Sequence, residues 1–339
     1  SVGQTRHNAN LPHGIAWNLA SIPWDTPHVV LELAIGRMAR NARLARPDIA
    51  IFTNILPAHL EHHHDLATVA ARKSAIFEGM ERGSVAILNR DMAEWERVHM
   101  AARIRGLRIV HYGVSESCDF RLLEYDPAGH QVSALIGGSE VRYFLGAAGE
   151  HMALNSLAVL AAVAATGGDI EPAIATFATF VPVAGRGEQR ELSFGVRHVT
   201  LIDDAYNANP GSMVAALSLL GSVGGDRRKV AVLGEMRELG PDAATYHAEL
   251  APLIAAHGIG CVHAVGDLYR DFWRSIPDDR RGRRASSVEE LKAGFLTELR
   301  DGDVLLLKGS HSTSMHEFVD WLKSMANPAV GHCEAEEAF

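Results

Sequence analysis

The chain has 339 residues, 47% hydrophobic and 22% charged, a balance typical of a folded globular protein and not of a disordered one. Its length favours two domains. Asp and Glu (41) outnumber Lys and Arg (32), and the formal net charge of -9 argues against nucleic acid or an anionic membrane as partner. No run reaches the roughly 18 apolar residues of a membrane span. The three scattered cysteines, Cys118, Cys261 and Cys333, predict neither a disulfide framework nor a zinc knuckle, so we expect a cytoplasmic protein.

The first half of the chain alternates short apolar runs with longer amphipathic stretches. His28–Ala34 and Ile49–Ile55 are rich in Val, Ile and Leu and predict buried strands. Further expected elements are strands at Ser84–Leu88 and Leu107–Tyr112, helices at Leu66–Met80 and Gly149–Thr166, and a small antiparallel excursion over Asp119–Leu145.

After Gly185-Arg186-Gly187 the pattern starts again. Strands are expected at His198–Ile202, Lys229–Leu233, Cys261–Val265 and Asp303–Leu307, and helices at Ser212–Leu220, Ala243–His257, Val288–Leu299 and Met315–Met325. Strands that alternate with helices indicate an α/β fold with a mostly parallel sheet. We therefore expect two domains, residues 1–187 and 188–339, with a loose tail from Asn327.

Three polar residues of the first half interrupt apolar surroundings. Glu32 ends the run VVLELAIG, where its carboxylate could face a ligand crevice at a strand end or form a salt bridge. His59 follows the next strand in a loop, and the adjacent run 62–64 (His-His-His) matches no zinc spacing. Lys73 lies in the apolar helix VAARKSAIFEGM, where a lysine either extends to solvent or, with a lowered pKa, reacts with carbon dioxide to give a carbamate that binds magnesium.

The second half offers two strand ends with polar residues. In LIDDAYNANP the adjacent acids Asp203 and Asp204 could bind ribose hydroxyls or a cation, or the segment could simply turn and cap a helix. LLLKGS, residues 305–310, ends a strand with a lysine and a glycine, which suits an anion. The chain contains neither G-x-x-x-x-G-K-[ST] nor a G-x-G-x-x-G that opens a helix, so it carries no complete phosphate-binding loop.

Taken in order, these segments resemble the Mur ligases, the ATP-dependent amide ligases of peptidoglycan precursor synthesis. The resemblance runs from about Asn8 to Leu322. It rests on VLELAIG, NILPAHLEHH, ARKSAIFEGM with ILNRD, GEHMALNSLAVLAA, AGRGEQ, LIDDAYNANPGSM, VAVLGEMRELG and GDVLLLKGS. DDAYNANP together with LGEMRELG points to the branch that adds D-alanyl-D-alanine to a uridine-nucleotide-linked peptide. The family implies a central ATP-binding α/β domain followed by a Rossmann-like α/β domain.

The resemblance implies a magnesium site and catalytic residues. Glu32 and His59 would hold Mg²⁺ at the ATP phosphates, together with Lys73, which stands where many members carry a carbamylated lysine. Arg186, at the junction of the two domains, would reach the phosphates. The implied reaction transfers a phosphoryl group from ATP to a carboxylate, and an amine then attacks the acyl phosphate to give an amide, ADP and phosphate.

The resemblance also implies binding residues for the nucleotide and the amine. Asn155 and His151 match residues near the adenine. Asp204 matches the acid that binds the ribose, with Tyr206 and Asn209 close by. Lys308 and Ser310 would line the amino-substrate side.

The chain departs from the family in two respects. The phosphate-binding loop and the nucleotide-binding N-terminal domain of the family are expected before Ser1. Ala34-Ile35-Gly36 and Arg40-Asn41-Ala42 replace the Gly-Ala-Asn and Gly-Glu-Ile common after the strand-end glutamate. Two alternatives therefore stay open: a Mur-type ligase with another substrate, such as a poly-amino-acid or cyanophycin-like one, and a non-catalytic nucleotide-binding remnant. We expect a monomer that binds a peptidyl nucleotide and an amino acid or dipeptide, without nucleic acid or membrane insertion.

Overall fold

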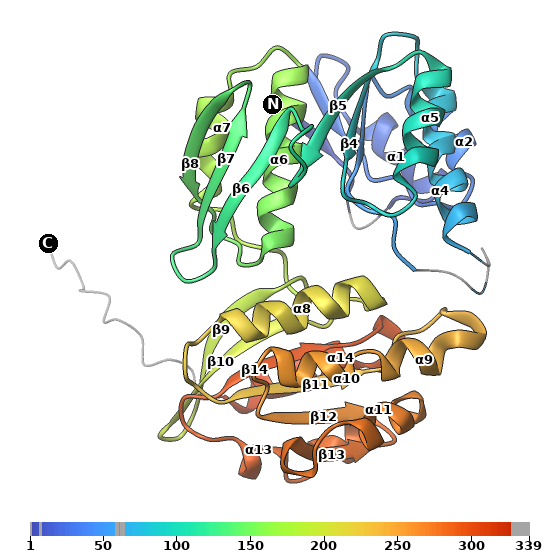
Figure 1. The fold of residues 1–339 in the computed structure, drawn as a ribbon. Helices are drawn as coiled ribbons and strands as arrows, with labels where there is room; N and C mark the ends of the chain where they lie inside the picture. The colour runs from blue at the N-terminus through green and yellow to red at the C-terminus, as the bar shows by residue number, and fades with distance from the viewer. Residues whose placement is uncertain (1, 7–8, 58–60, 62–64, 327–339) are drawn as a thin grey trace, which may run out of the picture.

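The computed structural model describes residues 2–6, 9–57, 61 and 65–326, and these form two lobes (Figure 1). The N-terminal lobe holds the elements from β1 to α7, and the C-terminal lobe holds those from β9 to α14. Each lobe is built on its own six-stranded sheet. The predicted α/β fold class is therefore confirmed. His59, the histidine run at 62–64, Cys333 and the expected tail lie outside the described residues.

The sheet of the N-terminal lobe has the strand order β3-β4-β5-β6-β7-β8. Strands β3 to β6 are parallel, whereas β6, β7 and β8 form an antiparallel meander, which confirms the expected excursion. The strands are β3 (Ile49–Phe52), β4 (Val85–Asn89), β5 (Arg108–Gly113), β6 (Phe120–Asp126), β7 (Gln131–Ile136) and β8 (Ser139–Phe144).

Helices cover both faces of this sheet, so the lobe has a hydrophobic core on each side. The long helix α6 packs on one face, and α4 and α5 pack on the other. The described helices are α1 (Pro12–Ser21), α2 (Met38–Ala45), α4 (Leu66–Ser74), α5 (Trp95–Arg105), α6 (Glu150–Ala165) and α7 (Ile170–Phe177). The expected helix over 66–80 ends its α-helical part at Ser74 and continues as the 3₁₀ turn Ala75–Gly79.

Two expected strands differ from the prediction. The run Ile49–Ile55 forms a strand only as far as Phe52, and Ile51 within it is 42% exposed. The run His28–Ala34 was predicted to be buried, but its strand β2 (His28–Val30) is short and exposed at every position. It pairs only with β1 (Val2–Gln4), in a parallel two-stranded sheet apart from the six-stranded one. Among the described residues no layer covers it, so an apolar sequence alone does not bury this strand.

The C-terminal lobe has a sheet in the order β13-β12-β11-β14-β10-β9, in which only β9 runs antiparallel to its neighbour. Its strands are β9 (Glu188–Phe194), β10 (Arg197–Asp204), β11 (Lys229–Gly234), β12 (Cys261–Val265), β13 (Arg281–Ala285) and β14 (Val304–Lys308). Every residue of β14 is buried, as expected for a central parallel strand covered on both faces.

Helices again cover both faces of the sheet. One core lies beneath α8 and α10, and the other lies beneath α12 and α14. The helices are α8 (Pro210–Ser222), α9 (Ala243–Ala248), α10 (Ala251–Ala256), α11 (Arg270–Ser275), α12 (Val288–Lys292), α13 (Phe295–Glu298) and α14 (Met315–Met325). No helix in the part of the chain that is described is long and apolar enough to cross a membrane.

Two expected helices are each divided in the structure. The helix predicted over Ala243–His257 is α9 followed by α10, because Pro252 opens a new helix and cannot continue the old one. The helix predicted over Val288–Leu299 is α12 followed by α13. Gly294 separates them with a φ of 78°, a left-handed conformation that ends a helix.

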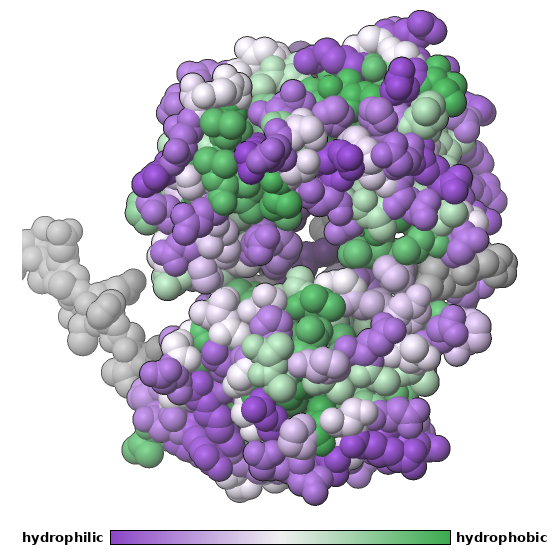
Figure 2. Space-filling view, viewed as in Figure 1, coloured by the Kyte–Doolittle hydropathy of each residue, from purple (hydrophilic) through white to green (hydrophobic). Residues whose placement is uncertain are grey.

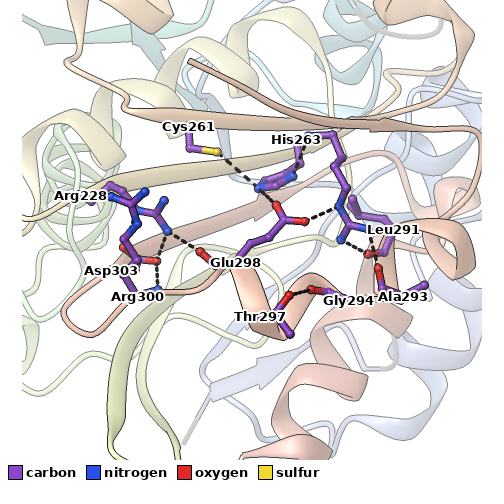
Figure 3. A network of polar contacts seen from close by, with 11 residues as sticks. Arg228, Cys261, His263, Leu291, Ala293, Gly294, Thr297, Glu298, Arg300 and Asp303 are labelled. Atoms are coloured by element: carbon purple, nitrogen blue, oxygen red, sulfur yellow. Dashed lines mark hydrogen bonds and ion pairs between the residues drawn. The ribbon is translucent and has the colours of Figure 1, made fainter. Parts of the chain in front are cut away.

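A polar network ties the amino ends of the C-terminal strands together (Figure 3). Arg228 donates two hydrogen bonds to the fully buried carboxylate of Asp303, at 2.8 and 2.6 Å. Beside them, the ring Nε2 of His263 lies 3.5 Å from the Sγ of Cys261 and 3.8 Å from a carboxylate oxygen of Glu298. Burial raises the pKa of the Cys261 thiol. The cysteine is therefore protonated and forms part of the packing.

Candidate nucleotide and substrate site

The loops after β10, β11 and β14 converge at the carboxyl edge of the C-terminal sheet, which is where α/β folds bind ligands. Ser310, only 4% exposed, joins all three loops. Its backbone N–H donates to the carbonyl of Glu235 at 3.1 Å, and its Oγ accepts from the backbone N–H of Arg237 at 2.9 Å. The same hydroxyl donates to the carbonyl of Ala208 at 3.4 Å. The serine thus fixes the mutual position of the loops.

A cavity of about 260 Å³ opens between these loops. Its lining is entirely polar apart from one alanine, and it contains both a guanidinium and a carboxylate. The lining residues are Asn207, Ala208, Asn209, Arg237, Glu238, Ser310, His311 and Ser312. The surface is hollowed between the two lobes in the space-filling view (Figure 2). Such a cavity suits a small ligand that carries one positive and one negative charge.

The adjacent acids Asp203 and Asp204 have different partners, as neighbouring strand residues on opposite faces do. Asp203 is buried, and its carboxylate accepts from Lys323 of α14 at 3.0 Å. Lys323 also lies 3.6 Å from Glu188. Asp204 turns instead toward Lys308, whose Nζ donates to its carboxylate at 2.7 Å. Only Asp204 is therefore paired with a group at the carboxyl edge.

Lys308 is almost fully buried, at 2% exposed, and its Nζ donates to two acceptors. Besides Asp204, its Nζ donates to the carbonyl of Asn207 at 2.9 Å. Desolvation raises the pKa of Asp204, and the charge and hydrogen bond of Lys308 oppose that rise. Lys308 is not among the residues that line the cavity, whereas Ser310 is.

Arg186 lies at the junction of the lobes, against the site. Its guanidinium carbon lies 4.3 Å from the ring centroid of Tyr206, a cation–π contact. The backbone N–H of Tyr206 donates to the carbonyl of Gly185 at 3.0 Å. Gly185 has a φ of 78°, and an added Cβ would lie 3.1 Å from the Cβ of Tyr206. The junction is therefore packed closely against the loop that carries Asp204.

The other expected nucleotide residues lie on two helices. Asn209 caps α8, and its Oδ1 accepts from the backbone N–H of Ser212 at 2.9 Å, so the helix-capping alternative is present in the structure. His151 and Asn155 lie one turn apart on α6. Packing around the partly accessible His151 ring lowers its pKa by desolvation, an effect that Asp204 opposes electrostatically and to which Lys308 adds. The His151 ring is thus close enough to this pair to feel both charges.

The expected metal residues lie elsewhere in the N-terminal lobe. Glu32 is exposed just after β2, and its carboxylate accepts from Asn10 at 2.9 Å. Lys73, on α4, is half-buried, and its Nζ donates to the carbonyl of Asn54 at 3.2 Å, just after β3. Desolvation lowers the pKa of Lys73. Among the described residues no hydrogen bond or ion pair joins Glu32 or Lys73 to the Asp204 pair, and no cluster of three His, Cys, Asp or Glu residues could hold a metal.

Two contacts connect the loop after β3 with the C-terminal lobe. The backbone N–H of Glu61 donates to the carbonyl of Glu238 at 3.4 Å. An added Cβ on Gly211, in the first turn of α8, would lie 2.6 Å from a methyl of Leu56. The strand-end loop of one lobe therefore packs directly against the cavity loops of the other.

Sequence reasoning did not identify Arg237, Glu235 or His311 as site residues. Glu235 is buried, accepts from the backbone N–H of Leu268 at 2.9 Å and lies 2.9 Å from the Arg237 guanidinium. The motif LGEMRELG could have indicated Glu235 and Arg237, because it combines the end of a buried strand with three charged residues. Ser310, whose hydroxyl accepts from the Arg237 backbone, lies 73 residues further along the chain, so the motif alone could not assign a role.

Two family comparisons cover most of the chain. The Mur ligase middle domain matches residues 1–163, and the Mur ligase glutamate ligase domain matches residues 185–311. The chain belongs to the Mur ligase family. Residues 164–184 separate the two matched ranges, and Arg186 lies at the start of the second one.

Individual Mur ligases match along nearly the whole chain. A UDP-N-acetylmuramoyl-tripeptide–D-alanyl-D-alanine ligase of Rickettsia prowazekii is 29% identical over 94% of this chain and 72% of its own length. The enzyme of that name from Escherichia coli is 29% identical over 93% and 69%. Among solved structures, MurF from Acinetobacter baumannii has a TM-score of 0.83 at 23% identity, over 95% of this chain and 70% of that one. MurF from Thermotoga maritima in complex with ADP has a TM-score of 0.81 at 23% identity, over 96% and 74%.

Proposed function

We propose that this Mur ligase uses ATP to join D-alanyl-D-alanine to a UDP-N-acetylmuramoyl-tripeptide, with release of ADP and phosphate. The observation that carries the proposal is the charged cavity beside Asp204 and Arg186, at the meeting of the two Mur ligase domains. The relatives that bear this name and match over 93% or more of the chain support the choice of substrates. We also place the domain boundary between residues 187 and 188.

In this proposal the nucleotide lies between the lobes. Asp204 accepts hydrogen bonds from the ribose hydroxyls, with Tyr206 and Asn209 beside it, and His151 and Asn155 of α6 lie near the adenine. Arg186 leaves the Tyr206 ring for the phosphates when the lobes close, since a guanidinium binds phosphate oxygens in a bidentate manner. Closure also protects the acyl phosphate from water.

A magnesium ion fits the N-terminal lobe in this proposal. Mg²⁺ takes one or two carboxylate oxygens and completes its shell with water and phosphate oxygens, so a cluster of three acids is not required. Glu32 is an exposed carboxylate held in place by Asn10, which suits such a ligand. Glu32 and His59 would hold the ion, together with Lys73 as a carbamate. The ion would supply neutralising charge for the phosphates.

The modification of Lys73 has a chemical basis in the structure. A carbamate forms when the neutral amine attacks carbon dioxide, makes an N–C bond and releases one proton. Desolvation lowers the pKa of Lys73, which increases the neutral fraction at a given pH. The product carries a negative charge in place of a positive one and is therefore an oxygen ligand.

The incoming dipeptide fits the cavity by charge. D-Alanyl-D-alanine carries an ammonium and a carboxylate at opposite ends, and the cavity presents Glu238 and Arg237. Arg237 is about half exposed and is paired on one side with Glu235, so its remaining N–H donors can bind a carboxylate. Ser310 lines the same cavity, as the sequence led us to expect for the amino-substrate side.

The test is a ligase assay on the whole natural protein that carries this sequence, with ATP, Mg²⁺, UDP-N-acetylmuramoyl-tripeptide and D-alanyl-D-alanine. ADP release is expected to require both the acceptor and the dipeptide. Release with a different acidic acceptor or amine, and not with these two, would instead support a Mur-type ligase outside wall synthesis. No ADP release with any pair, although ATP binds, would support a non-catalytic nucleotide-binding protein.

Arg237→Ala tests the dipeptide site separately. The KM for D-alanyl-D-alanine is expected to rise about 10- to 100-fold, since a charged hydrogen bond contributes about 1.5–3 kcal/mol. The KM for D-alanyl-D-alaninamide, which lacks the carboxylate, should change little. An equal rise for both amines would show that Arg237 does not bind the carboxylate.

We further propose that the protein acts as a cytoplasmic monomer, because the cavity, Arg186 and Asp204 all come from one chain and the proposed substrates are nucleotide-linked. Light scattering of the active protein should give the mass of a single chain. An active dimer whose dissociation abolishes turnover would contradict this.

A further inference from the structure

The proposed function leaves the buried Lys308 without a role, because its side chain does not line the cavity that would take the amine. A buried lysine is costly unless its charge is matched. Here the partner is Asp204, the acid assigned to the ribose, and the two residues face each other in register on the neighbouring parallel strands β10 and β14. Side chains at paired positions of adjacent strands lie on the same face of the sheet.

The geometry points to Lys308 as a positioning residue that holds the Asp204 carboxylate ionised and aimed at the ribose hydroxyls of the nucleotide. This inference rests on the proposed function. The lysine contacts one oxygen of Asp204, Oδ2, at 2.7 Å, so the other oxygen remains to accept from a ligand. Asp204 keeps 23% of its side chain exposed, whereas Lys308 is 2% exposed. The acid is thus accessible to a ligand and the lysine lies behind it.

A second contact makes the lysine a link between the two halves of the site. Its Nζ also donates to the carbonyl of Asn207 at 2.9 Å, and Asn207 lines the cavity proposed for the dipeptide. One buried ammonium group therefore fixes both the ribose acid and the first residue of the cavity loop. Without it, desolvation would favour the protonated form of Asp204, which is a weaker acceptor.

The neighbouring pair provides a matched comparison within the same sheet. Asp203 and Lys323 form an ion pair at 3.0 Å, one residue earlier on β10 but on the opposite face. Lys323 comes from α14 and also lies 3.6 Å from Glu188. Both lysines neutralise a strand-end aspartate, yet only Lys308 is bound to an acid at the ligand edge. A general effect of removing a buried ion pair should appear in variants of both lysines. A selective loss of ribose binding should appear only when Lys308 is replaced.

The experiment compares the binding of ADP and of 2′,3′-dideoxy-ADP to the whole natural protein by calorimetry. Dideoxy-ADP lacks the hydroxyls that Asp204 would bind. Lys308→Met is expected to weaken ADP binding about 10- to 100-fold, the value of one to two charged hydrogen bonds, and dideoxy-ADP binding less than about twofold. Asp204→Asn should show the same selective loss, and Lys323→Met should leave the ratio of the two affinities unchanged.

Two assignments are tested separately, the positioning role of Lys308 and the ribose-binding role of Asp204. If Asp204→Asn is selective but Lys308→Met weakens both nucleotides equally or neither, the positioning role is wrong and the ribose assignment stands. If Asp204→Asn does not change the ratio, the ribose assignment fails and the inference fails with it. Should Lys308→Met not fold, Lys308→Gln, which keeps an N–H donor for the Asn207 carbonyl, is measured in the same way and decides between these outcomes.

Discussion

At the scale of single residues, chemistry in this protein depends on which face of a strand a side chain occupies. Asp203 and Asp204 are the same amino acid at adjacent positions, yet each has a lysine of its own. Asp203 lies inside the C-terminal lobe, where its charge is matched by Lys323 of α14. Its role is therefore structural, whereas Asp204 faces the edge at which the nucleotide is proposed to bind.

Asp203→Ala is expected to lower the free energy of unfolding by about 1–3 kcal/mol, because the Lys323 ammonium loses its nearest partner and keeps only Glu188, 3.6 Å away. The affinity for ADP should stay within about twofold of the natural protein. Urea titration and calorimetry measure the two quantities. A stability loss below about 0.5 kcal/mol would show that the pair contributes as little as a surface salt bridge.

Lys73→Ala tests the proposal that a carbamate on Lys73 binds magnesium. Turnover should fall steeply and recover in part with acetate or propionate, because a short carboxylate can occupy the space of the carbamate and supply an oxygen ligand. The control is Arg72→Ala, the exposed neighbour on α4, which should keep nearly full turnover without added acid. Full activity of Lys73→Ala, or no response to any carboxylate, would contradict the role.

The strand-end pattern was sufficient to single out the adjacent acids Asp203 and Asp204 and the segment LLLKGS, and the resemblance to the Mur ligases added Arg186 and selected Asp204 and Ser310. The sequence was not sufficient to pair Lys308 with Asp204. That pairing depends on the register between β10 and β14, strands 104 residues apart. Nor could it reveal that LGEMRELG supplies Arg237 to the same cavity as Ser310, since the folding of three separate loops brings them together.

At the scale of elements, the central strands of the C-terminal sheet followed directly from apolar runs, whereas its edge strand β13 did not. Strand β13 reads RGRRA and was not expected, because it has no apolar pattern. It lies at the sheet edge, where its arginines bind carbonyl groups of neighbouring segments, among them those of Ile276 and Leu291. Charged edge strands of this kind also resist pairing with other molecules. Strand β2 shows the converse, an apolar run left exposed.

The network at the amino ends of the C-terminal strands predicts a pH dependence of stability. Burial lowers the pKa of His263 to about 4, and the nearby cations Arg283 and Arg228 add to the effect. The unfolded chain has the ordinary histidine pKa near 6.5. The unfolded chain therefore binds the proton more readily than the folded protein does. As a result, the free energy of unfolding falls as the pH drops from about 6.5 toward 4. The full cost is about 3 kcal/mol.

His263→Asn is the variant that isolates this contribution. The ring Nδ1 accepts from the backbone N–H of Arg283 at 3.1 Å, and an asparagine Oδ1 can accept in its place without titrating. The variant should be less stable at pH 7.5 because packing against Phe295 is lost. Its free energy of unfolding between pH 6.5 and 4 should fall less steeply than that of the natural protein. Equal slopes in urea titrations would exclude His263 as the source.

At the scale of the whole molecule, the junction and one loop of the N-terminal lobe hold the two lobes against each other. The junction at Gly185 to Gly187 carries Arg186 against the C-terminal lobe, and the loop after β3 carries Leu56 against α8. Gly185 and Gly187 have φ values of 78° and 84°, which favour glycine. An added Cβ meets Tyr206 at Gly185 but nothing within 4 Å at Gly187. A side chain therefore has space at Gly187, whereas at Gly185 it would press against Tyr206.

Gly185→Ala and Gly187→Ala should consequently differ. Both force a side chain into a left-handed conformation, at a cost of about 1 kcal/mol. Only Gly185→Ala also pushes the junction away from Tyr206, so it should reduce turnover more than Gly187→Ala at a similar loss of thermal stability. Steady-state kinetics beside thermal melts measure both effects. Equal turnover in the two variants would show that close packing at residue 185 does not matter to the reaction.

Gly211→Val tests whether the spacing of the lobes sets the rate. The branched side chain would enter the space of Leu56, whose methyl lies 2.6 Å from an added Cβ, and would move the N-terminal loops away from the cavity. A displacement of about 1 Å between reacting groups can cost on the order of 100-fold in rate. Turnover should therefore fall strongly, while Val214→Leu, on the exposed side of the same helix, should remain active.

A second substitution shows whether Gly211→Val slows turnover by displacing the lobes or by disturbing helix α8. Leu56→Ala removes the side chain that the valine meets, so the double variant should regain much of the lost turnover although Leu56→Ala alone gains nothing. Such non-additivity is the signature of two residues in direct contact. If the double variant is as slow as Gly211→Val, the loss arises within α8, where Gly211 lies next to the Asn209 cap. The rate would then depend on the capped helix and not on the distance between the lobes.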